Sequence, residues 1–171
     1  VAAPALSVPS IAALANSWSE QAVELNADVL ADECIEQGAD MLLAPGVNIK
    51  RTPLCGRNFE YFSEDPYLSG VLGGAYVKGL QNRGIGACVK HFCLNNREYD
   101  REFISSEIDE CTLMETYVRP FEIALKQKPW SVMCSYNKIN GVYASENAWI
   151  LKAILRDRLK FDGLVVSDWG A

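Results

Sequence analysis

The stretch Gly84-Ile85-Gly86-Ala87-Cys88-Val89-Lys90-His91-Phe92 decides the fold, because a helix ends in it and a buried strand begins. Upstream, Asp65-Pro66 supplies a cap and a proline suited to the first turn of that helix. The glycines end the helix, and residues 87–92 continue as a short, largely apolar segment. A helix leading directly into a buried strand predicts a chain that alternates the two elements.

The alternation continues on both sides of this stretch. Before it, Ser17-x-x-Glu20 has the pattern of a capping box, and helical spacing continues to Gly38. The apolar run Met41–Ala44, closed by Pro45-Gly46, is typical of a strand covered on both faces. The elements expected after it are a helical region over 109–126, bent or broken near Pro120, a strand over 131–135, a helix over 146–159 and a strand over 163–167.

This order predicts an α/β fold with a parallel sheet and crossover helices, either a (β/α) barrel or a doubly wound sheet. An eight-stranded barrel needs about 250 residues, and the 171 residues here supply about four βα units. We therefore expect residues 1–171 to be part of a TIM-like barrel. The chain opens at Val1 and ends at Ala171, soon after a strand, which indicates truncation at both ends.

Composition excludes several classes of function. With 49% apolar and 22% charged residues the chain is an ordinary globular one. Its net charge of -6 disfavours binding to nucleic acid or to anionic lipid. No apolar run reaches the roughly 18 residues of a membrane helix, so neither nucleic acid nor membrane is an expected partner. Composition does not indicate an oligomeric state.

The cysteines point to a reducing compartment. The six form no C-x-x-C pair, and a single histidine leaves little from which to build a structural zinc site. Most lie among apolar residues, as in Ala87-Cys88-Val89, which predicts buried free thiols. Free thiols favour a cytoplasmic location.

Polar residues follow the predicted strands at the points where the strands end. They are Lys90-His91, Ser135-Tyr136-Asn137 and Ser167-Asp168-Trp169, and the loop after the first strand adds Arg57. In parallel α/β folds the carboxyl ends of the strands meet at one rim, where ligands bind. The sequence therefore predicts a site at this rim.

Each candidate also has a purely structural interpretation. Asp168 could cap the next helix. On periodicity alone, this interpretation and a functional role for Asp168 have about equal weight. A lone histidine such as His91 is more often a structural residue. Lys90 is hard to bury without a partner or a hydroxylated ligand, which favours a site. Adjacent strand residues point to opposite faces, so Lys90 and His91 need a bulge or a strand end to reach one rim.

The arginine of the loop and the two aromatic residues of the rim also have two interpretations each. Arg57 could simply pair with Glu60 or Glu64, which the loop sequence alone favours. Tyr136 and Trp169 could be core aromatics, or could stack on the face of a sugar.

Several stretches together resemble glycoside hydrolase family 3, in its β-glucosidase-like group. They are Leu43-Ala44-Pro45-Gly46-Val47-Asn48-Ile49, Gly56-Arg57-Asn58-Phe59-Glu60, Phe62-Ser63-Glu64-Asp65-Pro66, Lys90-His91-Phe92, Cys134-Ser135-Tyr136-Asn137 and Ser167-Asp168-Trp169-Gly170-Ala171. Their order and spacing match the family across nearly the whole chain.

The resemblance implies a barrel-like catalytic domain of a retaining exo-β-glycosidase that takes a small β-glucoside or oligosaccharide. Asp168 is then the nucleophile. Arg57, Lys90 and His91 bind hydroxyls of the non-reducing-end sugar. Tyr136 lies beside the nucleophile, and Trp169 lines the aglycone side.

These residue types suit the chemistry. One carboxylate attacks the anomeric carbon, and a second carboxyl about 5–5.5 Å away protonates the leaving oxygen and then activates water. Cations near Asp168 favour its charged form. No metal or organic cofactor is required.

The resemblance also implies that parts of the machinery lie elsewhere. In two-domain members of the family the acid/base is a Glu on a later domain, so the fragment is expected to be inactive alone. The N-acetylglucosaminidase branch carries a His-Gly-x-Gly-like loop after the Lys-His pair, whereas Cys93-Leu94-Asn95-Asn96 follows here. Glu98, Glu102 and Glu107 are therefore expected to be solvated loop residues.

Two alternatives remain beside a β-glucosidase. One is a β-xylosidase or another exo-glycosidase on the same scaffold. The other is a non-catalytic sugar-binding α/β unit, because a fold alone does not establish catalysis.

Overall fold

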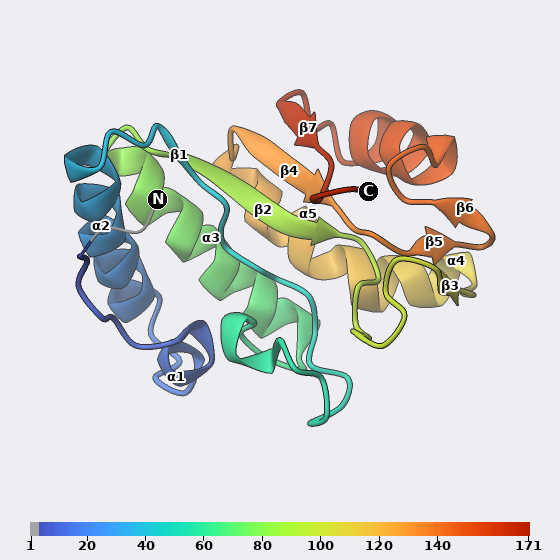
Figure 1. The fold of residues 1–171 in the computed structure, drawn as a ribbon, viewed down its shortest axis with the longest axis horizontal. Coiled ribbons are helices and arrows are strands. Elements are labelled where there is room, and N and C mark those ends of the chain that lie inside the picture. Colours follow the sequence, from blue (N-terminus) through green and yellow to red (C-terminus); the bar gives the residue numbers. More distant parts are fainter. Residues whose placement is uncertain (1–3) are drawn as a thin grey trace.

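A four-stranded parallel sheet forms the centre of the protein (Figure 1). The computed structural model describes residues 4–171, so Val1 lies outside the described residues. The strands are β1 (Met41–Leu42), β2 (Gly86–Phe92), β4 (Ser131–Cys134) and β7 (Leu164–Val166), in the order β1-β2-β4-β7. Each strand lies beside its predecessor, whereas a doubly wound sheet reverses direction at a switch point. Sequential order is that of a (β/α) barrel, and the predicted fold class is confirmed.

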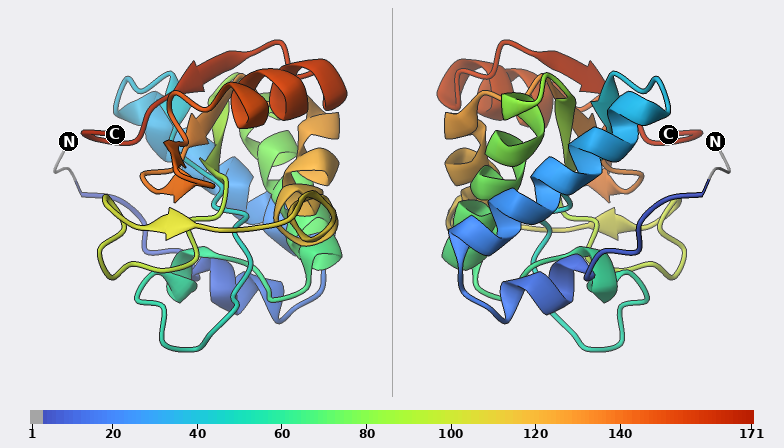
Figure 2. Two further views of the ribbon diagram at one scale, coloured as in Figure 1. Left: turned by 90° about the vertical axis from the view of Figure 1, so that its right-hand side faces the viewer. Right: turned by 90° about the vertical axis from the view of Figure 1, so that its left-hand side faces the viewer.

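Helices make the crossovers between these strands. They are α2 (Glu20–Glu36), α3 (Pro66–Asn82), a helical region from Glu110 to Gln127 and η4 (Trp149–Arg158). Helix α2 packs against α3, and α3 packs against α5 (Arg119–Ala124). Figure 2 shows these helices stacked around the outside of the strands.

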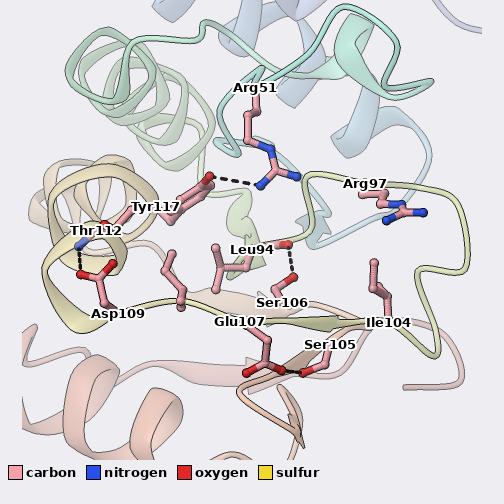
Figure 3. A pocket seen from close by; sticks show the side chains of 11 residues that line it. Arg51, Leu94, Arg97, Ile104, Ser105, Ser106, Glu107, Asp109, Thr112 and Tyr117 are labelled. Atoms are coloured by element: carbon pink, nitrogen blue, oxygen red, sulfur yellow. Dashed lines mark hydrogen bonds between the residues drawn. The ribbon is translucent and has the colours of Figure 1, made fainter.

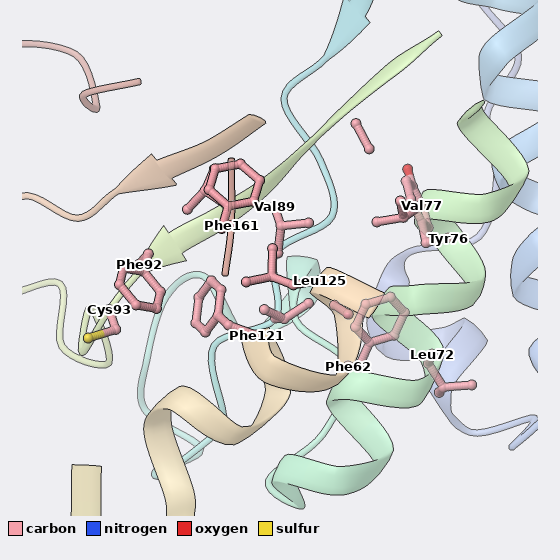
Figure 4. Packing of buried hydrophobic residues seen from close by; sticks show 14 of the residues in the cluster. Phe62, Leu72, Tyr76, Val77, Val89, Phe92, Cys93, Phe121, Leu125 and Phe161 are labelled. Atoms are coloured by element: carbon pink, nitrogen blue, oxygen red, sulfur yellow. The ribbon is translucent and has the colours of Figure 1, made fainter. Parts of the chain in front are cut away.

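The core lies between the sheet and its helices (Figure 4). Phe92 at the end of β2 meets Phe121 of α5 edge to face, with ring centroids 5.0 Å apart. Phe62 lies between Phe121 and α3, and Leu72 projects from the other side of α3; both are fully buried. Burial of such side chains contributes about 1.5–3 kcal/mol each, which holds the helices on the sheet.

The expectation that Met41–Ala44 is covered on both faces is wrong. All four residues are only partly buried, because β1 is an edge strand of the sheet. At the other edge, Leu164 of β7 is 60% exposed. Only the central strands β2 and β4 are buried throughout most of their length.

The predicted capping box at Ser17 is also wrong. The hydroxyl of Ser19 accepts a hydrogen bond from the Ala22 N–H and caps α2. Ser17 Oγ instead donates to the Leu14 carbonyl and closes a short helix, α1 (Ile11–Ala15), that the sequence analysis did not predict.

The helical region before β4 is not broken at Pro120. It begins with α4 (Glu110–Thr112), widens into the π-helical turn η2 (Leu113–Val118), continues as α5 and ends with η3 (Leu125–Gln127). The wide turn places Pro120 in the first turn of α5, where a backbone N–H is not needed. The helical region therefore continues through Pro120, and its hydrogen-bond pattern changes where a break was one of the two expectations.

The last helix starts later than predicted. The Asn147 Oδ1 accepts from the Ile150 N–H, and the helix runs over Trp149–Arg158 in place of 146–159. Asparagine competes with helical hydrogen bonds through its own side chain, which explains the shift.

A second, small sheet forms between the loops that follow β2 and β4. It contains β3 (Ser105–Ser106), β5 (Lys138–Ile139) and β6 (Val142–Tyr143). Strand β3 pairs in parallel with β5, which pairs antiparallel with β6. Two-residue strands carry no periodic signal, so the sequence alone does not predict them.

An irregularity in β2 positions the polar rim. The pairing with β4 shifts between Lys90 and Phe92, which leaves His91 as the additional residue. This is the bulge that adjacent Lys90 and His91 require. The loop after β1 stays close to β2, since Val47 N–H donates to the Lys90 carbonyl at 2.8 Å. Asn48 therefore arrives beside His91.

The state of the cysteines and the length of the helices can be compared with the expectations from the sequence. All six cysteines are free thiols, and Cys34, Cys88, Cys93 and Cys134 are buried, so the prediction of mostly buried thiols is confirmed. Among residues 4–171 we find no helix with the length and apolarity needed to cross a bilayer.

Candidate active site at the carboxyl rim of the sheet

His91 lies at the centre of the predicted site and is 1% exposed. The side chain of Asn48 holds its backbone: Nδ2 donates to the His91 carbonyl at 3.0 Å, and Oδ1 accepts from the His91 N–H at 2.7 Å. These two bonds fix the orientation of the amide. They anchor His91 where the regular pairing of β2 is interrupted.

The imidazole ring is held by Asn48 and by two further side chains. Arg57 Nη2 lies 2.9 Å from His91 Nε2. On the other side of the ring, Nδ1 lies 3.2 Å from the Tyr61 hydroxyl and 3.3 Å from Asn48 Oδ1. A guanidinium can only donate, so Nε2 is an acceptor and the ring proton is on Nδ1. His91 is the neutral imidazole.

Electrostatics agree with this assignment. Burial, followed by the positive charges of Arg57, Lys90 and Arg101, holds the pKa of His91 well below its usual value. The approach of Nε2 to Asp168 Oδ2, at 3.6 Å, is therefore not an ion pair. Two acceptor atoms face each other across that distance.

Asp168 lies just beyond β7 and is 9% exposed. Its Oδ1 accepts from the N–H of Trp169 at 2.8 Å. Its Oδ2 is buried and has no hydrogen-bond partner among the described residues. A buried carboxylate oxygen without a partner is costly, so this atom is available to a ligand. Within residues 4–171, Glu98 Oε1 and Asn137 Oδ1 are also buried without a partner, but Asp168 Oδ2 is the one of the three that lies 3.6 Å from His91.

Glu60 joins the two cations of the rim. Its Oε1 lies 2.5 Å from Arg57 Nε, and its Oε2 lies 3.2 Å from Lys90 Nζ. The pairing of Arg57 with Glu60, one of the expectations, is thus present, together with the contact of Arg57 to His91. Although burial raises the pKa of Glu60, the hydrogen bond from Arg57 and the charge of Lys90 hold it below its usual value.

The aromatic candidates differ in their surroundings. Tyr136 is buried, and burial, followed by the charge of the Asp168 carboxylate, raises its pKa. The Arg101 guanidinium stacks on the Tyr136 ring at 4.4 Å. Trp169 is 70% exposed, so it is not a core residue. Its indole is free to contact a ligand or another segment.

One of the three loop glutamates departs from expectation. Glu102 and Glu107 are exposed, but Glu98 is half-buried and pairs through Oε2 with Arg101 at 2.9 Å. The expectation of a solvated Glu98 is wrong, because the loop after β2 folds back over the rim and brings Arg101 beside it.

The structure thus brings Arg57, Lys90, His91 and Asp168 together, with Tyr136 adjoining. Sequence reasoning missed Asn48, Tyr61 and Arg101 and gave Glu60 no role beyond a pairing partner. Asn48 and Glu60 lie within the quoted motifs, which is the one signal that could have found them. Arg101 lies in Asp100-Arg101-Glu102, which has the appearance of a solvated charged run.

A separate cavity of about 520 Å³ is lined in part by Leu94 (Figure 3). Arg51, Arg97, Ser106 and Tyr117 are among its lining residues, and none of the four clustered site residues is. Arg51 there bonds the Tyr117 hydroxyl at 3.3 Å. Across residues 4–171, no group of three or more His, Cys, Asp or Glu side chains is placed to hold a metal ion.

Comparison with known proteins agrees with this geometry. Residues 4–171 match the family model described as the glycosyl hydrolase family 3 N terminal domain. The thermostable beta-glucosidase B of Acetivibrio thermocellus is 53% identical over 169 residues, which are 98% of this chain and 22% of that protein. An exo-alpha-(1->6)-L-arabinopyranosidase of Bifidobacterium longum is 47% identical over 169 residues, again 98% and 22% of the two chains.

Solved structures give the same result. The structure of beta-glucosidase 3B from Thermotoga neapolitana in complex with glucose superimposes with a TM-score of 0.93 at 50% identity, over 95% of this chain and 23% of that one. The chain therefore spans less than a quarter of the length of these relatives. The family match and the order of the strands agree in one assignment: the chain belongs to glycosyl hydrolase family 3, and its residues 4–171 match the N-terminal domain of that family.

Proposed function

We propose that the protein containing these residues is a retaining exo-β-glucosidase in which Asp168 is the nucleophile. The single observation that carries this assignment is the buried Asp168 Oδ2, which has no partner while the Trp169 N–H fixes Oδ1. A carboxylate oriented through one oxygen presents the other to an electrophile. Similarity to proteins named beta-glucosidases supports glucose as the sugar.

In the first step, Asp168 Oδ2 attacks the anomeric carbon of the bound sugar. The bond from that carbon to the glycosidic oxygen breaks, and its electron pair leaves with the oxygen, which takes a proton from a carboxylic acid. The product is a glycosyl ester on Asp168 and a free alcohol.

In the second step, water attacks the anomeric carbon of the ester. The acid/base, which is a carboxylate after the first step, accepts a proton from this water. Asp168 is released as a carboxylate, and the sugar keeps its anomeric configuration. The acid/base is expected to be a glutamate from a later domain, as in two-domain members of the family.

The cations of the rim bind the sugar in this proposal. Arg57 and Lys90 present N–H donors at the rim, and neutral His91, whose Nε2 accepts from Arg57, lies between Arg57 and Asp168. Donors and acceptors already fixed by neighbours require little reorganisation as charge develops in an oxocarbenium-like transition state. In this proposal the exposed Trp169 contacts the aglycone.

Trapping of the intermediate tests the proposal. A full-length protein containing this chain is incubated with an activated 2-deoxy-2-fluoro-β-glucoside and digested for mass spectrometry. We expect a fluoroglucosyl adduct on the peptide that contains Asp168, because fluorine slows hydrolysis of the ester.

Asp168→Asn in the same protein should lower kcat by about 10⁴-fold or more, since the attacking oxygen loses its charge. Asp162→Asn is the matched control, because Asp162 is exposed and precedes β7, at the end of the strand opposite Asp168. An adduct on another residue, or wild-type turnover by Asp168→Asn, would remove the assignment. Sugar binding without turnover in wild type would favour the non-catalytic alternative.

A second candidate is an exo-glycosidase that releases a pentopyranose. The observation in its favour is the 47% identity to a Bifidobacterium longum exo-alpha-(1->6)-L-arabinopyranosidase. Comparison of kcat/KM for p-nitrophenyl β-glucoside, β-xyloside and α-L-arabinopyranoside separates these activities. The glucosidase proposal requires the first substrate to be preferred.

A further inference from the structure

Among the described residues, Glu60 is the one anion that pairs with both Arg57 and Lys90. It closes the short helix η1 (Asn58–Glu60), three residues after Arg57, and it reaches across to Lys90 on β2. Each carboxylate oxygen is used by one cation. A loop cation and a strand cation thus share a single counter-charge.

The charge balance makes this bridge important. The side chains of Arg57, Glu60 and Lys90 are each less than a fifth exposed, so water screens their charges poorly. Without the carboxylate, two cations would face one another in a partly buried space. Arg57 is also tied through Nη2 to His91, which leaves the Nε contact with Glu60 to set the rotation of its guanidinium plane.

The bridge also decides which donors remain free. Within residues 4–171, no hydrogen bond engages Arg57 Nη1, and the Glu60 contact accounts for one of the three Lys90 N–H donors. The remaining donors are those available to a sugar. Their separation depends on the carboxylate that holds both side chains.

We infer that Glu60 is a positioning residue that sets the spacing of the Arg57 and Lys90 donors, and thereby decides which ring hydroxyls contribute to recognition. This inference rests on the proposed function, because it concerns how the same site reads its sugar. Glu60 acts through the two cations and does not itself touch the reacting atoms.

Deoxy substrates distinguish positioning from a merely structural ion pair. In the full-length protein, kcat and KM are measured for a β-glucoside and for its 2-, 3-, 4- and 6-deoxy analogues. The wild type should lose most activity with the analogues that lack hydroxyls held by Arg57 or Lys90. A site built to hydrogen-bond a hydroxyl discriminates strongly against its absence.

Glu60→Gln keeps the shape of the side chain but removes its charge, and it turns an N–H₂ donor toward one cation. We expect kcat/KM for the complete sugar to fall about 10²-fold. For the hydroxyls held by the two cations, the penalty of deoxygenation should shrink by about tenfold or more, whereas the other penalties stay the same. Equal losses with every substrate would overturn the inference.

Two further variants keep the result interpretable. Glu24→Gln is the matched control, because Glu24 pairs with Lys78 at 2.9 Å between α2 and α3, away from the rim. It should behave as wild type. Glu60→Asp retains the charge but is one methylene shorter and cannot hold both cations, so it should fold and show the same selective flattening. A wild-type pattern in Glu60→Asp would overturn the inference even if Glu60→Gln does not fold.

Binding separates this inference from the proposed function. Calorimetric Kd values for glucose and its deoxy analogues test the Glu60 pattern without turnover. Selective flattening of Kd in a protein that does not hydrolyse the glucoside would support Glu60 and overturn the enzymatic proposal. Absence of sugar binding by wild type would overturn both.

Discussion

At the scale of residues, the neutral state of His91 follows from the partners of its two ring nitrogens. Arg57 can only donate to Nε2, and the clamped Asn48 amide presents an oxygen to Nδ1. The ring is buried, so no water replaces these partners. A protonated ring would place an N–H against a permanent donor, which the surrounding cations oppose further.

This state makes the free energy of unfolding depend on pH. The pKa of His91 is lowered in the folded protein, so below the unfolded value of about 6.5 the unfolded chain binds a proton that the native state refuses. Stability is therefore lost as the pH falls from about 6.5 toward the folded pKa, by up to about 1.4 kcal/mol per pH unit. Urea unfolding between pH 7 and pH 5 measures this slope.

The comparison that isolates the effect is His91→Asn, which lacks the titrating ring. Its stability should be lower at pH 7 and should fall less steeply with acidification. His91 is the only histidine of the 171 residues, so no other imidazole within them contributes. Parallel pH profiles for wild type and variant would contradict the assignment of a neutral, buried ring.

At the scale of elements, close contact between α2 and α3 depends on a single missing side chain. A Cβ at Gly79 would lie 2.5 Å from the Glu24 carbonyl oxygen and 2.7 Å from Ala27 Cβ. Both obstacles belong to rigid parts of α2. Gly74 on the same helix has no atom nearer than 3.4 Å to such a Cβ, and that atom is in the flexible Gln127 side chain.

Gly79→Ala should therefore lower the free energy of unfolding by about 1–3 kcal/mol, because the helices must move apart. Gly74→Ala should leave it unchanged or raise it by up to about 1 kcal/mol through helix propensity. Chemical denaturation of both variants tests the contrast. Similar effects of the two substitutions would show that helix propensity, and not the approach of α2, dominates.

What the sequence could predict at this scale follows from how far each signal reaches. The caps, glycines and apolar spacing act over a few residues, and they placed α3 and β2 almost to the residue. The π-helical turns and the small sheet depend on partners distant in sequence. The strand ends are local signals, so the sequence predicts the rim. Asn48, Glu60 and Arg101 reach the rim through the course of long loops, which local signals do not predict.

At the scale of the whole molecule, the central sheet has two edges. Among the described residues, β1 and β7 each pair on one side only. Leu164 on β7 combines an unpaired backbone edge with an apolar side chain that is 60% exposed. Such an edge is a template for pairing with another chain.

A polypeptide of residues 1–171 should consequently associate as its concentration rises, and Leu164→Lys should reduce that association. Sedimentation velocity over a range of concentrations measures it. Leu25→Lys is the matched control, because Leu25 is 59% exposed but lies on helix α2. The edge explanation fails if Leu25→Lys is as effective, or if the unsubstituted polypeptide stays monomeric.

The pairing of β3 with β5 has a consequence for how this rim can be redesigned. Ser105 and Ser106 belong to the loop that follows β2, and they are hydrogen-bonded in register with Lys138 and Ile139 from the loop that follows β4. The two loops are thus one mechanical unit and not independent modules. Grafting either loop from a relative would break the shared ladder, so epistasis between them is built into the backbone. Libraries aimed at new sugars should exchange both segments together.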